Sequence, residues 1–157
     1  MATNRLTEPK TLDDMLLYVL WQLQAAARGP VVRVCEAEFG ITRREWRMLA
    51  QLADSEGMAS SALAERAALD RAQTSRAVSA LVQKGLVVRT PRPGNRREGL
   101  LHLTERGRAL YAALLPRVAR INQRLMSALN DDEAPTLEAL LLRLRVQADA
   151  LERAAPE

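Results

Sequence analysis

Aromatic residues, cysteine and histidine are all scarce in this sequence. Phe, Trp and Tyr make up 3% of the 157 residues, whereas apolar residues make up 48% and charged residues 27%. Abundant Ala, Leu and Arg with few aromatics favour helices over an all-β sandwich, and the apolar content argues against disorder. The single cysteine, Cys35, can form no internal disulfide and offers no metal cluster, so we expect neither a metal nor a cofactor.

Long apolar runs are also missing. No run approaches the ~20 residues that a membrane span needs, and residues 1–10 lack the apolar stretch of a signal peptide. We therefore expect a cytoplasmic protein with no membrane partner. The length allows one domain, expected at residues 11–157 behind a flexible N-terminal arm at 1–10.

Apolar spacing and capping residues predict several helices in the first half of the chain. A helix is expected from about 11 to 28, where Gly29-Pro30 should stop it, followed by a short one over 31–39. Thr42 and Glu45 have the spacing of a capping box, in which each side chain bonds the backbone N–H of the other. Further helices are predicted over 42–54, 60–68 and 70–84.

The helix over 70–84 has two distinct faces. Asp70 and Gln73 repeat the capping spacing at its start. At about 100° per residue, one face carries Thr74, Ala77, Val78 and Leu81, and the opposite face carries Ala72, Arg76, Ser79 and Gln83. The first face is suited to a core and the second to solvent or a partner.

Two short strands follow, at 86–89 and 100–103, separated by a turn-rich tip at 90–99. Three helices followed by a β-hairpin form a winged helix-turn-helix, so a mainly α fold is expected. We call this winged helix-turn-helix, at about residues 42–104, the lobe. Thr104 can cap a long helix to about residue 129. A last helix should start between 130 and 135, with Asp132 favoured as its cap.

The helices at both ends of the chain, 11–28 and 105–153, carry apolar stripes that the small lobe cannot cover. Exposed apolar patches of that kind usually mark an interface. We therefore expect a homodimer, the alternative being an extra helical layer in a monomer. The predicted interface residues are Leu12, Leu16, Val19, Leu137, Leu140, Leu141 and Leu144.

Positive charge is concentrated in one segment. The formal net charge is +4, yet residues 71–97 contain no acidic residue and seven basic ones: Arg71, Arg76, Lys84, Arg89, Arg92, Arg96 and Arg97. A solvated surface normally mixes both signs. A block of one sign across a helix and a hairpin indicates a polyanion, because each phosphate neutralised by Lys or Arg releases counterions.

The segment predicts contacts with double-stranded DNA. A helix fits the major groove, where Arg76 can read guanine, Gln73 adenine and the Ala72 methyl thymine. Arg71, Thr74 and Ser75 are better placed for phosphate or short-range polar contacts. In the wing, with Arg92 and Asn95 beside them, Arg96 and Arg97 can enter the minor groove.

In these elements the sequence resembles the MarR family of bacterial transcription regulators. The resemblance spans about residues 11–153 and depends on the order and spacing of several short matches. They are Ile41-Thr42, Trp46-Arg47-Met48-Leu49, Leu63-Ala64-Glu65-Arg66, Thr74-Ser75-Arg76, Leu81-Val82-Gln83-Lys84-Gly85-Leu86-Val87, Asn95-Arg96-Arg97, Leu103-Thr104-Glu105-Arg106-Gly107, and Glu133 with Leu140-Leu141.

The resemblance implies a homodimer on a pseudo-palindromic DNA site, with recognition by the helix over 71–84. It also implies repression relieved by a small aromatic acid. The family's wing usually reads Asp-Arg-Arg, and Asn95 replaces that acid here. The helix before the recognition helix often opens with a capping Thr in this family, but this chain has Ala59 there, so Ser60 or Ser61 must substitute as the cap. Ser60 and Ser61 are also expected to supply supporting phosphate contacts.

Several residues admit a second interpretation. Trp21, Trp46 and Arg47 can line an effector pocket, although core packing or a solvated arginine explains them too. Cys35 can act as a redox sensor, but Glu36 beside it would raise the pKa of its thiol. A catalytic Cys35–His102 pair matches no nucleophile motif. A helical adaptor that binds only protein would leave the acid-free segment unexplained.

Overall fold

The structure is a computed structural model that describes residues 4–55, 57–92 and 95–154, and it describes only the backbone of residues 92 and 95–98. The chain divides into two compact units, Met1–Ala119 and Arg120–Glu157. The first contains η1 (Leu12–Asp14), α1 (Leu16–Arg33), η2 (Val34–Glu38), α2 (Arg43–Asp54), β1 (Met58–Ala59), α3 (Ser60–Ala67), α4 (Arg71–Gln83), β2 (Val87–Arg92), β3 (Asn95–Leu103) and most of α5 (Glu105–Met126). The second contains the end of α5 and α6 (Glu133–Arg153).

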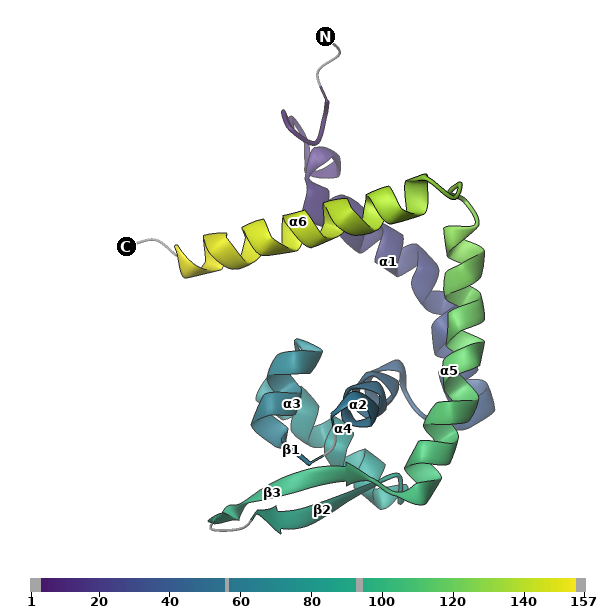
Figure 1. Cartoon of the computed structure of the whole chain (residues 1–157), viewed down its shortest axis with the longest axis vertical. Helices are drawn as coiled ribbons and strands as arrows, with labels where there is room; N and C mark the ends of the chain where they lie inside the picture. Colours follow the sequence, from purple (N-terminus) through teal and green to yellow (C-terminus); the bar gives the residue numbers. More distant parts are fainter. Residues whose placement is uncertain (1–3, 56, 93–94, 155–157) are drawn as a thin grey trace. The chain divides into compact units, whose positions relative to one another are not determined.

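One core joins three short helices to a small sheet. Figure 1 shows α2, α3 and α4 gathered beside the sheet, with the β2–β3 hairpin running past them. The sheet is antiparallel with strand order β1-β3-β2. Fully buried residues from every one of these helices and from β3 meet in this core, among them Leu49, Leu52, Leu63, Val78, Leu81 and Leu101. The predicted winged helix-turn-helix, mainly helical, is confirmed.

The predicted capping box at the start of α2 is complete, the one at the start of α4 is present only as the Asp70 cap, and the N-cap residue of α3, Ala59, makes no side-chain cap bond. The Glu45 N–H donates to Thr42 Oγ1 at 3.1 Å, and the Thr42 N–H donates to the Glu45 carboxylate at 2.6 Å. At the start of α4, the Gln73 N–H donates to the Asp70 carboxylate at 2.7 Å. Each cap satisfies backbone N–H groups that the first helical turn leaves unpaired.

The prediction that Gly29-Pro30 stops the first helix was wrong. The α1 helix runs through both residues to Arg33 and continues into η2. Proline removes one backbone hydrogen bond inside a helix, but Val31 and Val34 pack against the core beyond that point. Their burial offsets the local cost. At the other end, Thr11 caps η1 together with Asp14, and α1 begins only at Leu16.

The hairpin is longer than the sequence pattern indicated. The segment expected as a turn-rich tip lies mostly in β2 and β3, with a register shift between Pro91 and Arg92. The strand β1 was not predicted at all. It has two residues, which pair with Leu101 and Leu100, and so short a segment shows no alternation of its own.

The N-cap residue of α6 is Asp132, as predicted, but another side chain caps the helix. Asn130 Oδ1 accepts from the N–H groups of Glu133 at 2.9 Å and Asp132 at 3.0 Å, and the Asn130 N–H donates to the Glu133 carboxylate. Asp132 therefore occupies the N-cap position as predicted but makes no side-chain cap bond, and Asn130 supplies that bond instead. Pro135 sits within the first turn, where a missing N–H costs little. The preceding helix, α5, ends at Met126 rather than at residue 129.

None of the described helices combines the length and apolarity needed to cross a membrane. Within the same described part of the chain, His, Cys, Asp and Glu side chains nowhere gather in a group of three that would suit a metal ion.

The start of α5 packs so closely on the hairpin that it requires glycine. Gly107 is buried, and a Cβ there would overlap the backbone carbonyl of Leu86. We expect Gly107→Ala to lower the free energy of unfolding by about 2 kcal/mol or more, since overpacking against backbone has no easy relief. Urea denaturation followed by circular dichroism measures it.

Gly29→Ala is the matched control, because its Cβ would meet only the flexible end of Arg33 at 3.4 Å within α1. This variant should be stabilised by about 0.5–1 kcal/mol through the higher helix propensity of alanine. Equal effects of the two substitutions would contradict the packing described for Gly107.

Candidate functional site

The outward face of α4 carries most of the predicted DNA-contacting residues. Arg71, Ala72, Ser75 and Arg76 are exposed and Gln73 is half-buried, whereas Ala77, Val78 and Leu81 are buried on the opposite face. The predicted two faces of this helix are confirmed. The core holds α4 from behind and leaves one row of polar and basic side chains free.

Thr74 is the exception among the predicted contacts. It is 1% exposed, and its hydroxyl donates to the Asp70 carbonyl at 2.9 Å. This placement argues against the phosphate contact expected of Thr74. The roles of the other five recognition-helix residues stay predictions.

Lys84 is removed from the basic surface by an ion pair. Its ammonium lies 2.8 Å from the Glu45 carboxylate and also donates to the Gly40 carbonyl at 2.9 Å. Glu45 is 4% exposed and the Lys84 side chain 37% exposed, so the pair joins the end of α4 to the start of α2 with its carboxylate buried. Sequence reasoning missed it, although Glu45 occupies the same face of α2 as Met48, Leu49 and Leu52, which signals a buried carboxylate.

The wing contributes one described basic side chain, Arg89, which is exposed on β2. The side chains of Arg92, Asn95, Arg96 and Arg97 lie outside the described part of the structure, so their predicted contacts stay predictions. Ser60 and Ser61 stand in the first turn of α3, directly after Ala59 at the N-cap position. Ser61 is exposed and Ser60 half-buried, and their phosphate contacts also stay predictions.

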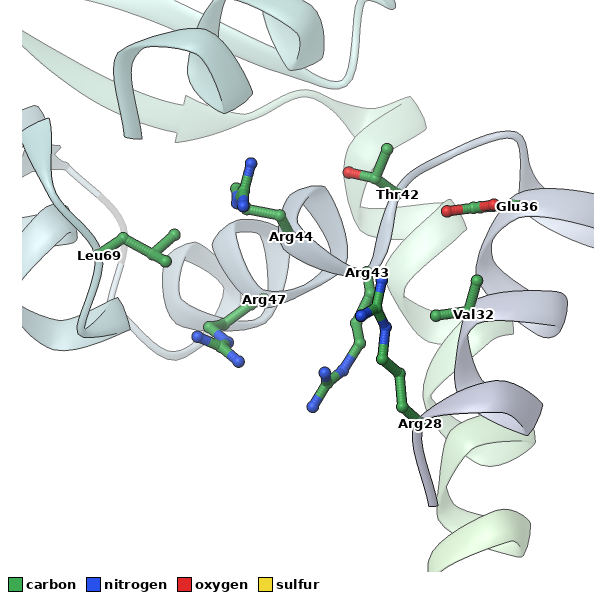
Figure 2. Close-up of a pocket in the computed structure, with 8 residues that line it drawn as sticks. All are labelled: Arg28, Val32, Glu36, Thr42, Arg43, Arg44, Arg47 and Leu69. Carbon is green, nitrogen blue, oxygen red and sulfur yellow. The ribbon is translucent and has the colours of Figure 1, made fainter. Parts of the chain in front are cut away.

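A pocket of about 390 Å³ lies against α2, and we call it the arginine pocket. Figure 2 shows its walls, with α1 and η2 on one side, α2 in the middle and the turn after α3 at the far end. It is lined by Arg28, Val32, Glu36, Thr42, Arg43, Arg44, Arg47 and Leu69. Arg47 donates to the Ala67 carbonyl at 3.2 Å. Burial, and after it the charges of Arg43 and Arg44, lower the pKa of Arg47.

Of the three residues predicted for an effector pocket, Arg47 alone lines this one. Trp46 packs against the core and stacks on Tyr111 with ring centroids 5.4 Å apart. Trp21 is 58% exposed and stacks on Tyr18. Sequence reasoning treated residues 42–45 as a capping box only, and it overlooked that two arginines inside the box, with Arg47 one turn later, form a dense cationic stretch.

Cys35 is fully buried. Burial raises the pKa of its thiol, and the neighbouring charge of Glu36 raises it further. The reactive form of cysteine is the thiolate. The environment of Cys35 therefore works against both the redox sensor and the nucleophile considered above.

The residues predicted for a dimer interface lie at the surface of this single chain. Leu12 is exposed in η1, while Leu16 and Val19 are half-buried in α1. The α6 helix has no buried residue at all among those described. Its four predicted interface leucines, Leu137, Leu140, Leu141 and Leu144, are 37–45% exposed.

Comparison with known proteins gives consistent matches over most of the chain. A MarR family model matches residues 39–98. A putative transcriptional regulatory protein for the hcr operon of Thauera aromatica is 36% identical over 121 residues, covering 77% of this chain and 73% of that protein.

Two solved structures extend the comparison. The transcriptional repressor CouR, bound to a 23-mer DNA duplex, has a TM-score of 0.76 at 27% identity, over 92% of this chain and 98% of that one. PcaV from Streptomyces coelicolor, in complex with its natural ligand, has a TM-score of 0.71 at 26% identity, over 94% and 99%.

The ion pair between Lys84 and Glu45 should matter to stability. We expect Lys84→Met to lower the free energy of unfolding by about 2–3 kcal/mol, because it leaves a buried carboxylate without its cation. The comparison is Arg117→Met, which breaks the exposed pair of Arg117 with Glu38 at 2.7 Å. That loss should stay below about 1 kcal/mol. If both variants lose less than about 1 kcal/mol of unfolding free energy in urea denaturation, the Lys84–Glu45 pair does not stabilise the protein.

Proposed function

The chain belongs to the MarR family of transcriptional regulators, and on that basis we propose that it is a homodimeric repressor released from DNA by a small aromatic acid. The observation that carries the proposal is the two-sided helix α4. Its inner face is fixed in the core, and its outer face presents Arg71 and Arg76 with the short side chains of Ala72 and Ser75 between them.

Recognition follows from the dimensions and chemistry of that outer face. An α-helix fits the major groove, and short side chains such as Ala72 and Ser75 allow its backbone to approach the base edges. Arg76 can donate two parallel hydrogen bonds to guanine, and Gln73 can pair with adenine. Arg71 and the basic residues of the wing supply phosphate contacts, which set affinity and register rather than sequence preference. The similar repressor CouR has been solved on a DNA duplex.

Dimerisation is supported by the apolar surface of the terminal helices. A stable helix buries an apolar face, because isolated helices gain little from backbone bonding alone. The α6 helix leaves large apolar side chains such as Leu142 and Val146 exposed as well as its predicted interface leucines. A second copy related by two-fold symmetry would cover them and present two recognition helices about one DNA turn apart.

Release by an effector requires a site linked to α4. The arginine pocket qualifies, because Arg43, Arg44 and Arg47 belong to α2, and Glu45 on the same helix holds Lys84 at the end of α4. A ligand shifts DNA affinity only through different affinities for the two arrangements of the lobe. A coupling free energy of about 1–3 kcal/mol gives a 5–150-fold change. The similar regulator PcaV has been solved with its natural ligand.

Arg76 provides the sharpest test of base recognition. We expect Arg76→Ala to weaken binding to the preferred duplex by about 1–3 kcal/mol and to relax the preference at one base position in each half-site. Arg76→Lys should relax the same preference while keeping the salt dependence, since lysine retains the charge but not the planar pair of donors. Fluorescence anisotropy over a panel of duplexes and salt concentrations measures both quantities.

Arg66→Ala serves as the control. Its guanidinium donates a hydrogen bond to the Ser55 hydroxyl at 2.7 Å, and it lies outside the acid-free segment. It should leave the base preference unchanged. If Arg76→Ala preserves specificity, Arg76 does not read bases. If no duplex is bound even at low salt, where phosphate contacts are strongest, the chain is not a DNA-binding regulator and the protein-binding adaptor is favoured.

A further inference from the structure

The arginine pocket has a composition that points to a particular class of ligand. We propose that it binds a small organic molecule carrying two or three negative charges, either on phosphate or on several carboxylates. The proposal rests on the proposed function only for the consequence of binding, which is release of DNA. The binding itself depends on the pocket alone.

The lining of the arginine pocket is strongly positive. Four of its eight residues are arginines, Arg28, Arg43, Arg44 and Arg47, and its one acidic residue is Glu36. The formal charge of the lining is thus +3. Arg28, Arg43 and Arg44 have no ion-pair partner among the residues that the structure describes, and the hydrogen bond of Arg47 goes to an uncharged carbonyl.

This concentration of positive charge costs free energy while no anion is bound. Arg43 and Arg47 stand four residues apart on α2, where like charges repel. Arg44 adds a third charge on the same turn, and burial of Arg47 weakens the screening by water. The lowered pKa of Arg47 reflects both effects. An anionic ligand would remove the repulsion, so part of its affinity comes from relieving it.

The charge of the lining also determines how much negative charge a ligand should carry. One carboxylate engages one guanidinium fork through its two oxygens and brings a single negative charge. It would leave most of the positive charge of this pocket uncompensated. A phosphate brings a charge of about −1.5 to −2 and three acceptor oxygens, and a polycarboxylate brings a comparable charge through separate groups. Charge complementarity therefore favours a ligand of two or three charges over a monoacid.

The pocket also differs from what a simple aromatic acid requires. Its lining includes no aromatic side chain, since Trp46 lies against Tyr111 instead. Val32 and Leu69 provide apolar contact at two places, and the hydroxyl of Thr42 adds a polar one. These features suit a compact organic scaffold with anionic groups at several points. The aromatic acid implied by family resemblance fits only if it carries additional anionic groups.

DNA is the other polyanion that arginines attract. Two observations favour a small molecule here. The volume of about 390 Å³ lies in the range of small-molecule pockets. The walls include Arg28, Val32 and Glu36 from α1 and η2, elements separate from the outward face of α4.

The experiment titrates the full-length chain without DNA, by calorimetry at constant ionic strength, with pyrophosphate, citrate and benzoate. We expect pyrophosphate or citrate to bind at least tenfold more tightly than benzoate, and which of the two binds identifies phosphate or carboxylate as the anionic group. Arg44→Ala and Arg28→Ala should each weaken that binding about tenfold or more. Arg33→Ala should not weaken it, because Arg33 is an exposed arginine of α1 that carries the same charge but does not line the pocket.

The proposal is overturned if benzoate binds as tightly as the polyanions, if neither polyanion binds, or if Arg33→Ala weakens binding as much as the pocket variants. It is also overturned if Arg71→Ala or Arg76→Ala removes the binding instead, since the anion then sits on α4. A second titration measures how much bound duplex the added polyanion releases. It should release far less duplex from the Arg44→Ala variant than from the Arg33→Ala variant. A chain that binds polyanions but no duplex would fail the proposed function and leave this inference standing.

Discussion

The structure depends on one constraint, that α4 must be held firmly from behind while its front stays free. Hydrophobic burial of Ala77, Val78 and Leu81 does most of the holding. The ion pair of Lys84 with Glu45 fixes the end of the helix to the start of α2. Because these contacts use only the inner face, the outer face can present arginines that no acidic residue of the same segment neutralises.

The same constraint explains how positive charge is distributed. One lysine of the basic segment is used internally, so the charge available to a polyanion comes from arginines, which pair bidentately with phosphate oxygens. A second group of arginines gathers in the pocket formed by α1, η2 and α2. Both groups belong to the first compact unit, and α2 contributes to the pocket and packs against α4. A ligand and a duplex can therefore influence one another through a single short helix without any long pathway.

Features set by neighbouring residues could be predicted from the sequence. The Thr42–Glu45 box, the Asp70 cap and the two faces of α4 follow from spacings of three and four residues, and all are present. Features set by distant residues could not be predicted in this way. The continuation of α1 through Pro30 depends on packing of Val34, and β1 exists only through its pairing with β3.

The site shows the same division between local and distant information. The exposed residues of α4 could be predicted, because helical periodicity alone separates them from the core. The pairing of Lys84 with Glu45 spans 39 residues, and the arginine pocket joins parts of the chain from Arg28 to Leu69. No local pattern carries that information. Thr74 was misjudged for a simpler reason, since its place on the apolar face outweighs its polar hydroxyl.

The central claim is that a symmetric pair of α4 helices reads duplex DNA. Selection of binding sites from a random pool of duplexes by the purified chain tests it most directly. The account predicts an enriched inverted repeat whose half-site centres are separated by about 10 base pairs. Enrichment of a single unrepeated motif, or of no sequence at all at low salt, would contradict it.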